Sequence, residues 1–210
     1  YSKKDRDAVY KCMERGYRFP EITSWIRANK KDFELVKDIG LKETGILVSC
    51  SDYHIFYKMK KTRRQAMDQY LSVVRECLET GISPRCHLED ITRSDIYGFV
   101  IPFCLELMKL QDEYDIPVKI RACDTMGYGV NFSGAVIPRS VQGICYGLTK
   151  HAGVPSENLE WHGHNDFYKA VANSTTAWLY GASGINCSLF GIGERTGNTP
   201  LEAMVFEYAQ

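Results

Sequence analysis

Two histidines separated by a single glycine, His162 and His164, are the residues whose spacing most directly suggests chemistry. On a β-strand, residues two apart project from the same face, about 6–7 Å apart along the backbone. Both imidazoles can then reach one divalent metal ion. Imidazole ligands suit zinc, manganese, iron or cobalt, and additional carboxylate and water ligands would admit magnesium. The pattern therefore predicts a metal site at the end of a strand.

A glycine-punctuated segment, Gly191–Asn198, follows further along the chain and ends in a residue with an amide oxygen. Two histidines and one amide oxygen leave coordination positions open for a substrate that chelates through two oxygens. This is the arrangement of a Lewis-acid site. These residues therefore indicate metal-assisted chemistry on a carbonyl group.

A third segment places Arg85, His87 and Glu89 at alternate positions, so that they share one face of a strand. Three ionisable side chains pointing inward are unfavourable unless they are partnered or functional. The arginine suits a carboxylate, and Glu89 could transfer protons near the metal. Thr125 and His54 follow the ends of two other strands, where they either contact a substrate or only complete a turn and cover the rim.

The segments that position these residues alternate between short β-type runs and longer runs of helical periodicity. The expected strands are Arg18–Thr23, Thr44–Cys50, Pro84–Glu89, Val118–Cys123, Leu159–His162 and Ile185–Phe190. The expected helices are Lys31–Ile39, Thr62–Thr80, Ser94–Tyr114, Ser133–His151, Phe167–Tyr180 and Pro200–Ala209. Glycines follow the last periodic residue of several of these helices, as is typical of helix C-termini.

Repeated βα units predict parallel strands with helices packed outside them. A doubly wound open sheet and a (β/α)8 barrel both fit this description. No Gly-x-Gly-x-x-Gly follows the first strand, which disfavours a dinucleotide-binding sheet, and polar residues at each strand end favour the barrel. We therefore expect an α/β fold, a (β/α)8 TIM barrel. Since only about six of the eight strands are visible, residues 1–210 are expected to form one incomplete catalytic domain that lacks the first and last strands.

The composition is that of a globular enzyme-sized domain: 210 residues, 44% hydrophobic, with 26 basic and 26 acidic side chains. This balance gives no reason to expect nucleic acid, and no apolar run is long enough to span a membrane. The chain does not begin with Met or a signal peptide, so we expect it to be part of a longer protein. Eight cysteines without a Cys-x-x-Cys pair predict structural thiols in a reducing cytoplasm.

Five motifs, in consistent order over nearly the whole chain, resemble those of the DRE-type metallolyase superfamily of (β/α)8 barrels. Within it, they are similar to the Claisen-condensing homocitrate, isopropylmalate, citramalate and Re-type citrate synthases, and Trp161–Lys169 is most similar to the last group. The motifs are Ser51–His54 with Tyr57 and Lys58, Arg85–Asp95, Asp124–Gly127, His162–Asp166 and Gly191–Asn198.

The resemblance implies a role for each candidate position. It implies His162, His164 and Asn198 as metal ligands, Glu89 and His54 as catalytic residues, and Arg85, Thr125 and His87 as substrate-binding residues. In the homocitrate branch, the arginine that Arg85 matches binds the distal carboxylate of a dicarboxylic oxo acid. Arg85 therefore favours a dicarboxylic acceptor over a branched one.

The activity implied is a Claisen condensation of acetyl-CoA with a 2-oxo acid, giving citrate from oxaloacetate or homocitrate from 2-oxoglutarate. It would depend on Mn, Mg, Zn or Co, in a cytoplasmic homodimer without membrane or nucleic-acid partners. Isopropylmalate or citramalate synthesis, an aldol-type acyl-CoA lyase and a non-catalytic barrel are the alternatives. The glycine segment lacks the cysteine of the lyases, which favours a synthase. The family's Asp-Arg-Glu motif and C-terminal subdomain are absent, so we expect these 210 residues alone to be inactive.

Overall fold

The computed structural model describes residues 2–210 and contains one six-stranded sheet in the order β1 to β6. The strands are β1 (Ser24–Arg27), β2 (Glu43–Ser49), β3 (Ser83–Glu89), β4 (Lys119–Asp124), β5 (Leu159–Gly163) and β6 (Gly184–Asn186). Each strand pairs in parallel with the next one along the chain. Sequential parallel pairing is what repeated βα units produce. The prediction of an α/β fold of the TIM-barrel type, present as a partial barrel, is therefore confirmed.

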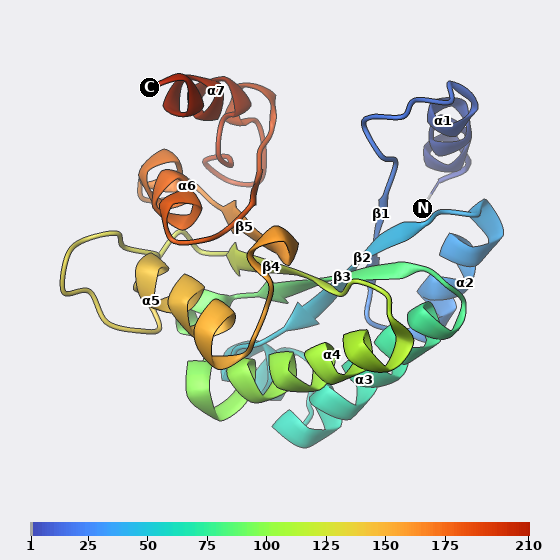
Figure 1. The fold of residues 1–210 in the computed structure, drawn as a ribbon, viewed down its shortest axis with the longest axis horizontal. Helices are drawn as coiled ribbons and strands as arrows, with labels where there is room; N and C mark the ends of the chain where they lie inside the picture. Colours follow the sequence, from blue (N-terminus) through green and yellow to red (C-terminus); the bar gives the residue numbers. More distant parts are fainter. Residues whose placement is uncertain (1) are drawn as a thin grey trace.

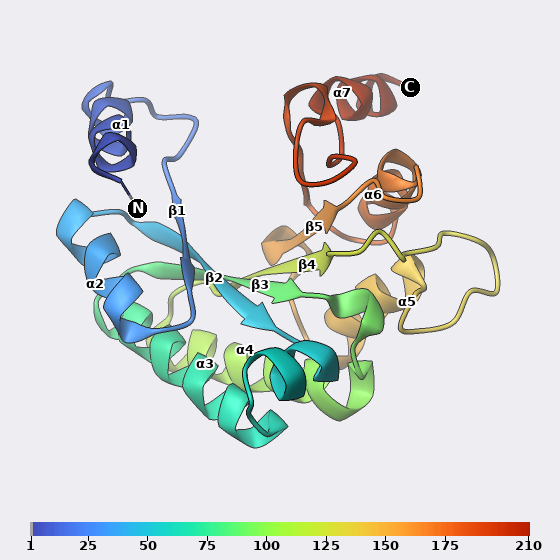
Figure 2. The same cartoon turned by 180° about the vertical axis from the view of Figure 1, so that it is seen from behind.

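Helices follow the outer side of this curved sheet from α2 to α6, whereas α1 and α7 lie at its two ends (Figures 1 and 2). The helices are α1 (Lys3–Glu14), α2 (Lys30–Ile39), α3 (Arg63–Glu79), α4 (Ile101–Tyr114), α5 (Val141–Tyr146), α6 (Ala170–Leu179) and α7 (Leu201–Ala209). Short helical turns are η1 (Tyr53–Lys58), η2 (Ile91–Arg93), η3 (Ile96–Val100), η4 (Gly147–His151), η5 (Ser156–Asn158) and η6 (Leu189–Gly191). No helix within residues 2–210 is long and apolar enough to cross a membrane.

The strands alternate between an apolar outer face and a polar inner face. Outer-face side chains pack under the helices and are fully buried; they include Ile46, Val48, Cys86, Leu88, Ile120, Ala122 and Trp161. Inner-face residues of the same strands include Arg85, His87, Glu89 and Arg121. A hydrophobic layer thus fixes the sheet, and its inner face is left to carry charged and polar side chains.

Local sequence explains where the main helices begin and end. Thr62 caps α3, because its side chain accepts a hydrogen bond from Gln65 N and the Gln65 side chain accepts one from Thr62 N. Asn29 caps α2 in the same position, and Gly40 ends that helix in the left-handed conformation with a φ of 80°. Gly40 therefore ends α2 where the chain turns back into β2.

Some expected elements were wrong. The first strand lies at Ser24–Arg27, where it pairs with residues of β2, and not at Arg18–Thr23. Residues 133–140 are a loop and not the start of a helix, which begins only at Val141. The helix α1 was not expected; none of its residues is fully buried, and Val9 and Met13 pack partly buried against the core. The final strand ends at Asn186, well before Phe190.

The eight cysteines form no disulfide, and six of them are buried. Burial raises the pKa of Cys123, Cys104 and Cys145 to about 12, so these thiols stay protonated and unreactive at neutral pH. The expectation that one catalytic domain is completed by segments beyond residues 1–210 stays a prediction.

Candidate active site

A cleft of about 530 Å³ opens where the strands end, a size typical of small-molecule sites. Six of the expected site residues line it: His87, Glu89, Thr125, His162, His164 and Asn198. They come from β3, from the ends of β4 and β5, and from the glycine-rich segment after β6. The carboxyl ends of parallel strands meet at one edge of the sheet, which brings residues so distant in sequence together.

The histidine pair lies at the end of β5. The Nε2 atoms of His162 and His164 are 2.9 Å apart, and the two rings are perpendicular, with an angle of 89° between their planes. On the other side of its ring, the Nδ1 of His162 lies 2.6 Å from the amide oxygen of Asn186, which ends β6. Because an amide oxygen only accepts hydrogen bonds, His162 carries its proton on Nδ1. Its Nε2 lone pair therefore faces His164.

Both imidazoles are neutral at pH 7. Burial lowers the pKa of His162 to about 4, and burial together with the charge of Arg195 lowers the pKa of His164. His164 Nδ1 is buried without a hydrogen-bond partner among residues 2–210. Two neutral imidazoles that meet through Nε2, one of them already oriented by an amide, have the donor set of a divalent metal site.

Asn198 lies beside this pair, since a β-bridge joins it to His164. Its side-chain nitrogen makes no hydrogen bond within residues 2–210. A Cβ atom at Gly193 would lie 1.6 Å from the Asn198 Oδ1, so the absence of a side chain there makes room for the amide. No cluster of three or more His, Cys, Asp or Glu residues suited to a metal occurs in residues 2–210. The histidines and Asn198 therefore fit a metal with additional ligands, and the ligand set stays a prediction.

The glycine-rich segment is attached to the strand ends by Arg195. Its guanidinium donates to both carboxylate oxygens of Asp166, at 2.7 and 3.0 Å, and to the backbone oxygen of Thr125 at 2.6 Å. The hydrogen bonds from Arg195, together with its charge, lower the pKa of Asp166. One arginine thus joins three chain segments around the cleft, and it holds Asn198 near the histidines.

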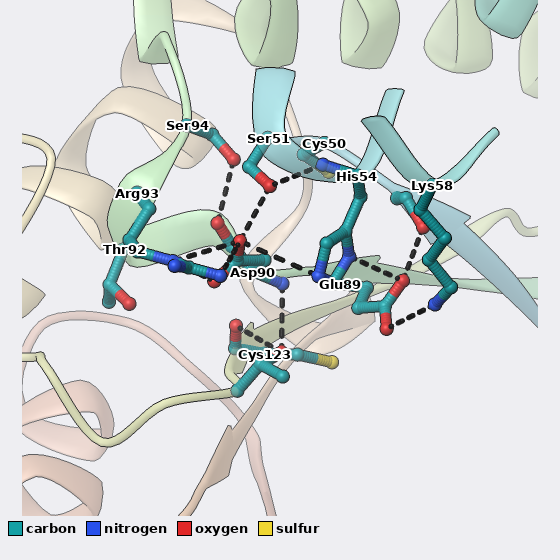
Figure 3. Close-up of polar contacts among 12 residues, drawn as sticks. Cys50, Ser51, His54, Lys58, Glu89, Asp90, Thr92, Arg93, Ser94 and Cys123 are labelled. Atoms are coloured by element: carbon teal, nitrogen blue, oxygen red, sulfur yellow. Dashed lines mark hydrogen bonds and ion pairs between the residues drawn. The ribbon is translucent and has the colours of Figure 1, made fainter. Parts of the chain in front are cut away.

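A second polar cluster surrounds Glu89 and Asp90 (Figure 3). The Nδ1 of His54 lies 3.0 Å from a carboxylate oxygen of Glu89, and the ring reaches toward Asp90 on its other side, with 4.0 Å between Nε2 and Oδ2. Lys58 Nζ lies 3.4 Å from a carboxylate oxygen of Glu89, and the Ser49 hydroxyl donates a hydrogen bond to the other oxygen of Glu89. Burial favours a raised pKa for Glu89, but hydrogen bonds from His54 and Ser49 outweigh it and lower the pKa to about 2. Glu89 is therefore ionised.

Asp90 fixes the end of β3 in place. It is fully buried in the left-handed conformation, with a φ of 67°, and its carboxylate accepts hydrogen bonds from Ser51 and from the guanidinium of Arg93. Its backbone N–H donates to the Thr125 hydroxyl at 2.8 Å. Thr125 is oriented by this bond, and its own hydroxyl donates to the backbone oxygen of Cys123 over a long distance of 3.4 Å.

Two expected site residues do not line the cleft. His54 does not line it but contacts Glu89, which does, and its catalytic role stays a prediction. Arg85 lies deeper on the inner face, where it forms ion pairs with Glu43 and, at 3.0 Å, with Glu160. The assignment of Arg85 to a substrate carboxylate stays a prediction, and it would require these pairs to open.

The polar strand ends, the paired histidines and the glycine-rich segment agree with one family of known proteins. The family model named HMGL-like matches residues 1–209. The chain belongs to the HMGL-like family. The resemblance inferred from the motifs is therefore confirmed.

Several curated relatives of the chain are synthases. A Citrate (Re)-synthase of Clostridium kluyveri is 69% identical over 210 residues, which cover 100% of this chain and 46% of that protein. A Citrate (Re)-synthase of Syntrophus aciditrophicus is 58% identical over 99% of this chain and 33% of its own length. A 2-phosphinomethylmalate synthase of Streptomyces hygroscopicus is 40% identical over 98% and 47%. The chain thus spans about half the length, or less, of these relatives.

Solved structures of the same fold include HMG-CoA lyases. The enzyme of Bacillus subtilis matches with a TM-score of 0.70 and 21% identity, over 98% of this chain and 68% of that one. The enzyme of Brucella melitensis matches with a TM-score of 0.72 and 16% identity, over 99% and 71%. At such identities the likeness establishes the fold of this HMGL-like chain and no more.

Sequence reasoning missed two residues of the site, Asn186 and Arg121. Asn186 orients His162, and Arg121 lines the cleft beside His87. The strand that ends at Asn186 has only three residues, so its register could not be read from the sequence. Arg121 was detectable, since it stands two residues before Cys123 on the inward face of its strand.

Proposed function

We propose that the full-length protein carrying this chain condenses acetyl-CoA with a 2-oxo acid in a metal-dependent Claisen reaction, with oxaloacetate as the acceptor and citrate as the product. One observation carries the proposal: two neutral histidines meet through Nε2 at 2.9 Å in a cleft that Thr125 and Glu89 also line. The similarity to two Citrate (Re)-synthases, at 69% and 58% identity, supports the choice of reaction and acceptor.

The residues of the cleft suit a chelating acid. A divalent cation held by His162, His164 and Asn198 would polarise the carbonyl of a 2-oxo acid. Thr125, oriented by the Asp90 N–H, can donate its hydroxyl proton to the adjacent carboxylate of the acid by exchanging its long, 3.4 Å bond to the Cys123 backbone oxygen. Arg195 donates a hydrogen bond to the backbone oxygen of Thr125. This bond keeps the loop that carries Asn198 close to Thr125, so the two residues hold fixed positions relative to each other.

In the reaction, a base removes a proton from the methyl group of acetyl-CoA, and the resulting carbon forms a bond to the carbonyl carbon of the acid. The carbonyl oxygen takes up a proton, and water then cleaves the thioester to release CoA and the new carboxylate. Glu89, with a pKa of about 2, is a weak base at neutral pH, and it suits a fixed negative charge that positions Lys58. Proton transfer by Glu89 and His54 stays a prediction.

The alternative acceptors differ only in the acid that the cleft binds. Relatives named as citramalate and 2-isopropylmalate synthases are 32% and 30% identical to this chain, well below the Citrate (Re)-synthases. The segment from Gly191 to Asn198 contains Glu194 and Arg195 and no cysteine, which favours condensation over the lyase reaction. Homodimer formation and a cytoplasmic location stay predictions.

The test is CoA thiol release by the metal-loaded full-length protein from acetyl-CoA, with oxaloacetate, 2-oxoglutarate, pyruvate or 2-oxoisovalerate. We expect release with oxaloacetate, and we expect His162→Ala to abolish it by removing one imidazole from the pair. The matched control is His151→Ala, because His151 lies in a surface cluster with Tyr97 and Tyr146, outside the cleft. Absence of release with every acid would exclude the condensation. Release with another acid would reassign the acceptor.

A further inference from the structure

Five charged side chains form a connected group on the inner face of the sheet, below the cleft. They are Glu43, Arg85, Lys119, Arg121 and Glu160, and we call them the inner ionic layer. Arg85 pairs with both carboxylates, and Lys119 pairs with Glu43. Arg121 donates to one oxygen of Glu160 through Nε at 2.7 Å and Nη2 at 2.6 Å.

The charges of the inner ionic layer do not balance. Three cations face two carboxylates, and the side chain of Arg121 is only 14% exposed. Among residues 2–210, Arg121 has a single carboxylate partner, Glu160, which Arg85 also uses. A largely buried cation is stable only when it is fully paired. The layer therefore carries one positive charge that an additional anion would neutralise.

That charge is available from the cleft. Arg121 lines the cleft, whereas Arg85 and Lys119 do not. In the sheet, Arg121 is the register partner of His87, and Cys123, two residues further on, is the partner of His162. Two residues along a parallel strand correspond to about 6.6 Å. A short acid with one end at the histidine pair thus has its other end at the level of Arg121.

The basic side chains Lys58 and His87, which also line the cleft, are either paired with a carboxylate or uncharged. Lys58 is paired with Glu89. Burial and the charges of Arg121 and Arg85 lower the pKa of His87 to about 2, so its imidazole is neutral. His87 Nε2 is buried without a hydrogen-bond partner within residues 2–210. The floor of the cleft therefore presents one guanidinium charge with an unpartnered neutral imidazole beside it.

We propose that Arg121 binds the distal carboxylate of the 2-oxo acid and selects dicarboxylic over monocarboxylic acceptors. The proposal rests on the proposed function and adds to it the residue that determines specificity. Arg85 is a poorer candidate, because turning toward the substrate would leave two buried carboxylates with fewer partners. Glu160 acts as a positioning residue, since its carboxylate holds Nε and Nη2 and leaves the remaining guanidinium edge to the ligand.

The experiment measures binding of oxaloacetate and pyruvate by calorimetry to the Mn²⁺-loaded full-length protein, without acetyl-CoA, and then CoA release with each acid. Pyruvate has the 2-oxo carboxylate of oxaloacetate but lacks the distal one. We expect Arg121→Gln to weaken oxaloacetate binding about 10- to 100-fold, the range for a hydrogen-bonded charged group. Binding of pyruvate should change by less than about twofold. Arg121→Lys should recover part of the lost affinity, since it restores the charge without the planar donor group.

Arg64→Gln is the matched control, because it makes the same substitution in an exposed ion pair with Asp68 on α3, outside the cleft and the inner ionic layer. It should leave the ratio of oxaloacetate to pyruvate affinity unchanged. A thermal melt of each variant verifies that the fold is retained. If Arg85→Gln lowers the ratio and Arg121→Gln does not, or if both acids bind equally to the unmodified protein, the assignment of Arg121 is overturned. Selective binding of oxaloacetate without CoA release would instead refute the proposed function and leave the Arg121 assignment intact.

Discussion

The contact between His162 and Asn186 gives a quantitative prediction about metal affinity. Replacing Asn186 with leucine removes the amide oxygen that lies 2.6 Å from His162 Nδ1. The imidazole is then free to carry its proton on Nε2, where it would donate to His164 at 2.9 Å. A metal would have to displace that proton. We expect Asn186→Leu to weaken divalent metal binding about 10- to 100-fold, which is about 1.4 to 2.7 kcal/mol.

The assay is calorimetric titration of the metal-free full-length protein with Mn²⁺ and with Co²⁺. Asn186→Asp retains an acceptor oxygen at the same place and should bind metal at least as tightly as the unmodified protein. Asn158→Ala removes an amide that contacts Gln111 away from the cleft, and it should have no effect. Unchanged metal affinity in Asn186→Leu would refute the reasoning. A loss of metal affinity in Asn186→Asp equal to that in Asn186→Leu would also refute it, because the tautomer of His162 is the only reason to expect these two variants to differ.

Two further predictions concern His87 and Gly193. The pKa of His87 is lowered from 6.5 to about 2 by burial and by the nearby arginines, so the unfolded chain binds this proton at higher pH than the folded protein. The free energy of unfolding should therefore fall by about 2 kcal/mol between pH 7 and pH 5 on account of His87. In urea unfolding measurements, the free energy of His87→Gln should decrease over this pH range by about that much less than the free energy of the unmodified protein. Gly193→Ala should displace the Asn198 amide and weaken metal binding while the melting temperature stays nearly constant. If the double variant Gly193→Ala/Asn198→Ala binds metal more weakly than Asn198→Ala alone, the displacement argument is wrong.

The sequence was sufficient for the central strands and for the cleft residues attached to them. A two-residue alternation placed His87 with Glu89 on one face of β3 and His162 with His164 on one face at the end of β5, and all four line the cleft. It failed at the sheet edges, where β1 has four residues and β6 has three. Edge strands this short contain too few alternating positions to define a period, so only pairing with the neighbouring strand determines where they lie.

The roles of the two inward arginines show what a single strand cannot reveal. Arg85 and Arg121 look equivalent along their own strands, because each alternates with buried apolar residues. Their environments differ through the register between strands. Arg121 is directly opposite Glu160 across the β4–β5 pair, whereas Arg85 reaches Glu43 on one side and Glu160 on the other. Arg85 thus has two carboxylate partners and lies below the cleft, whereas Arg121 has one and lines the cleft. Which arginine meets a substrate thus depends on carboxylates carried by neighbouring strands, which are remote in sequence.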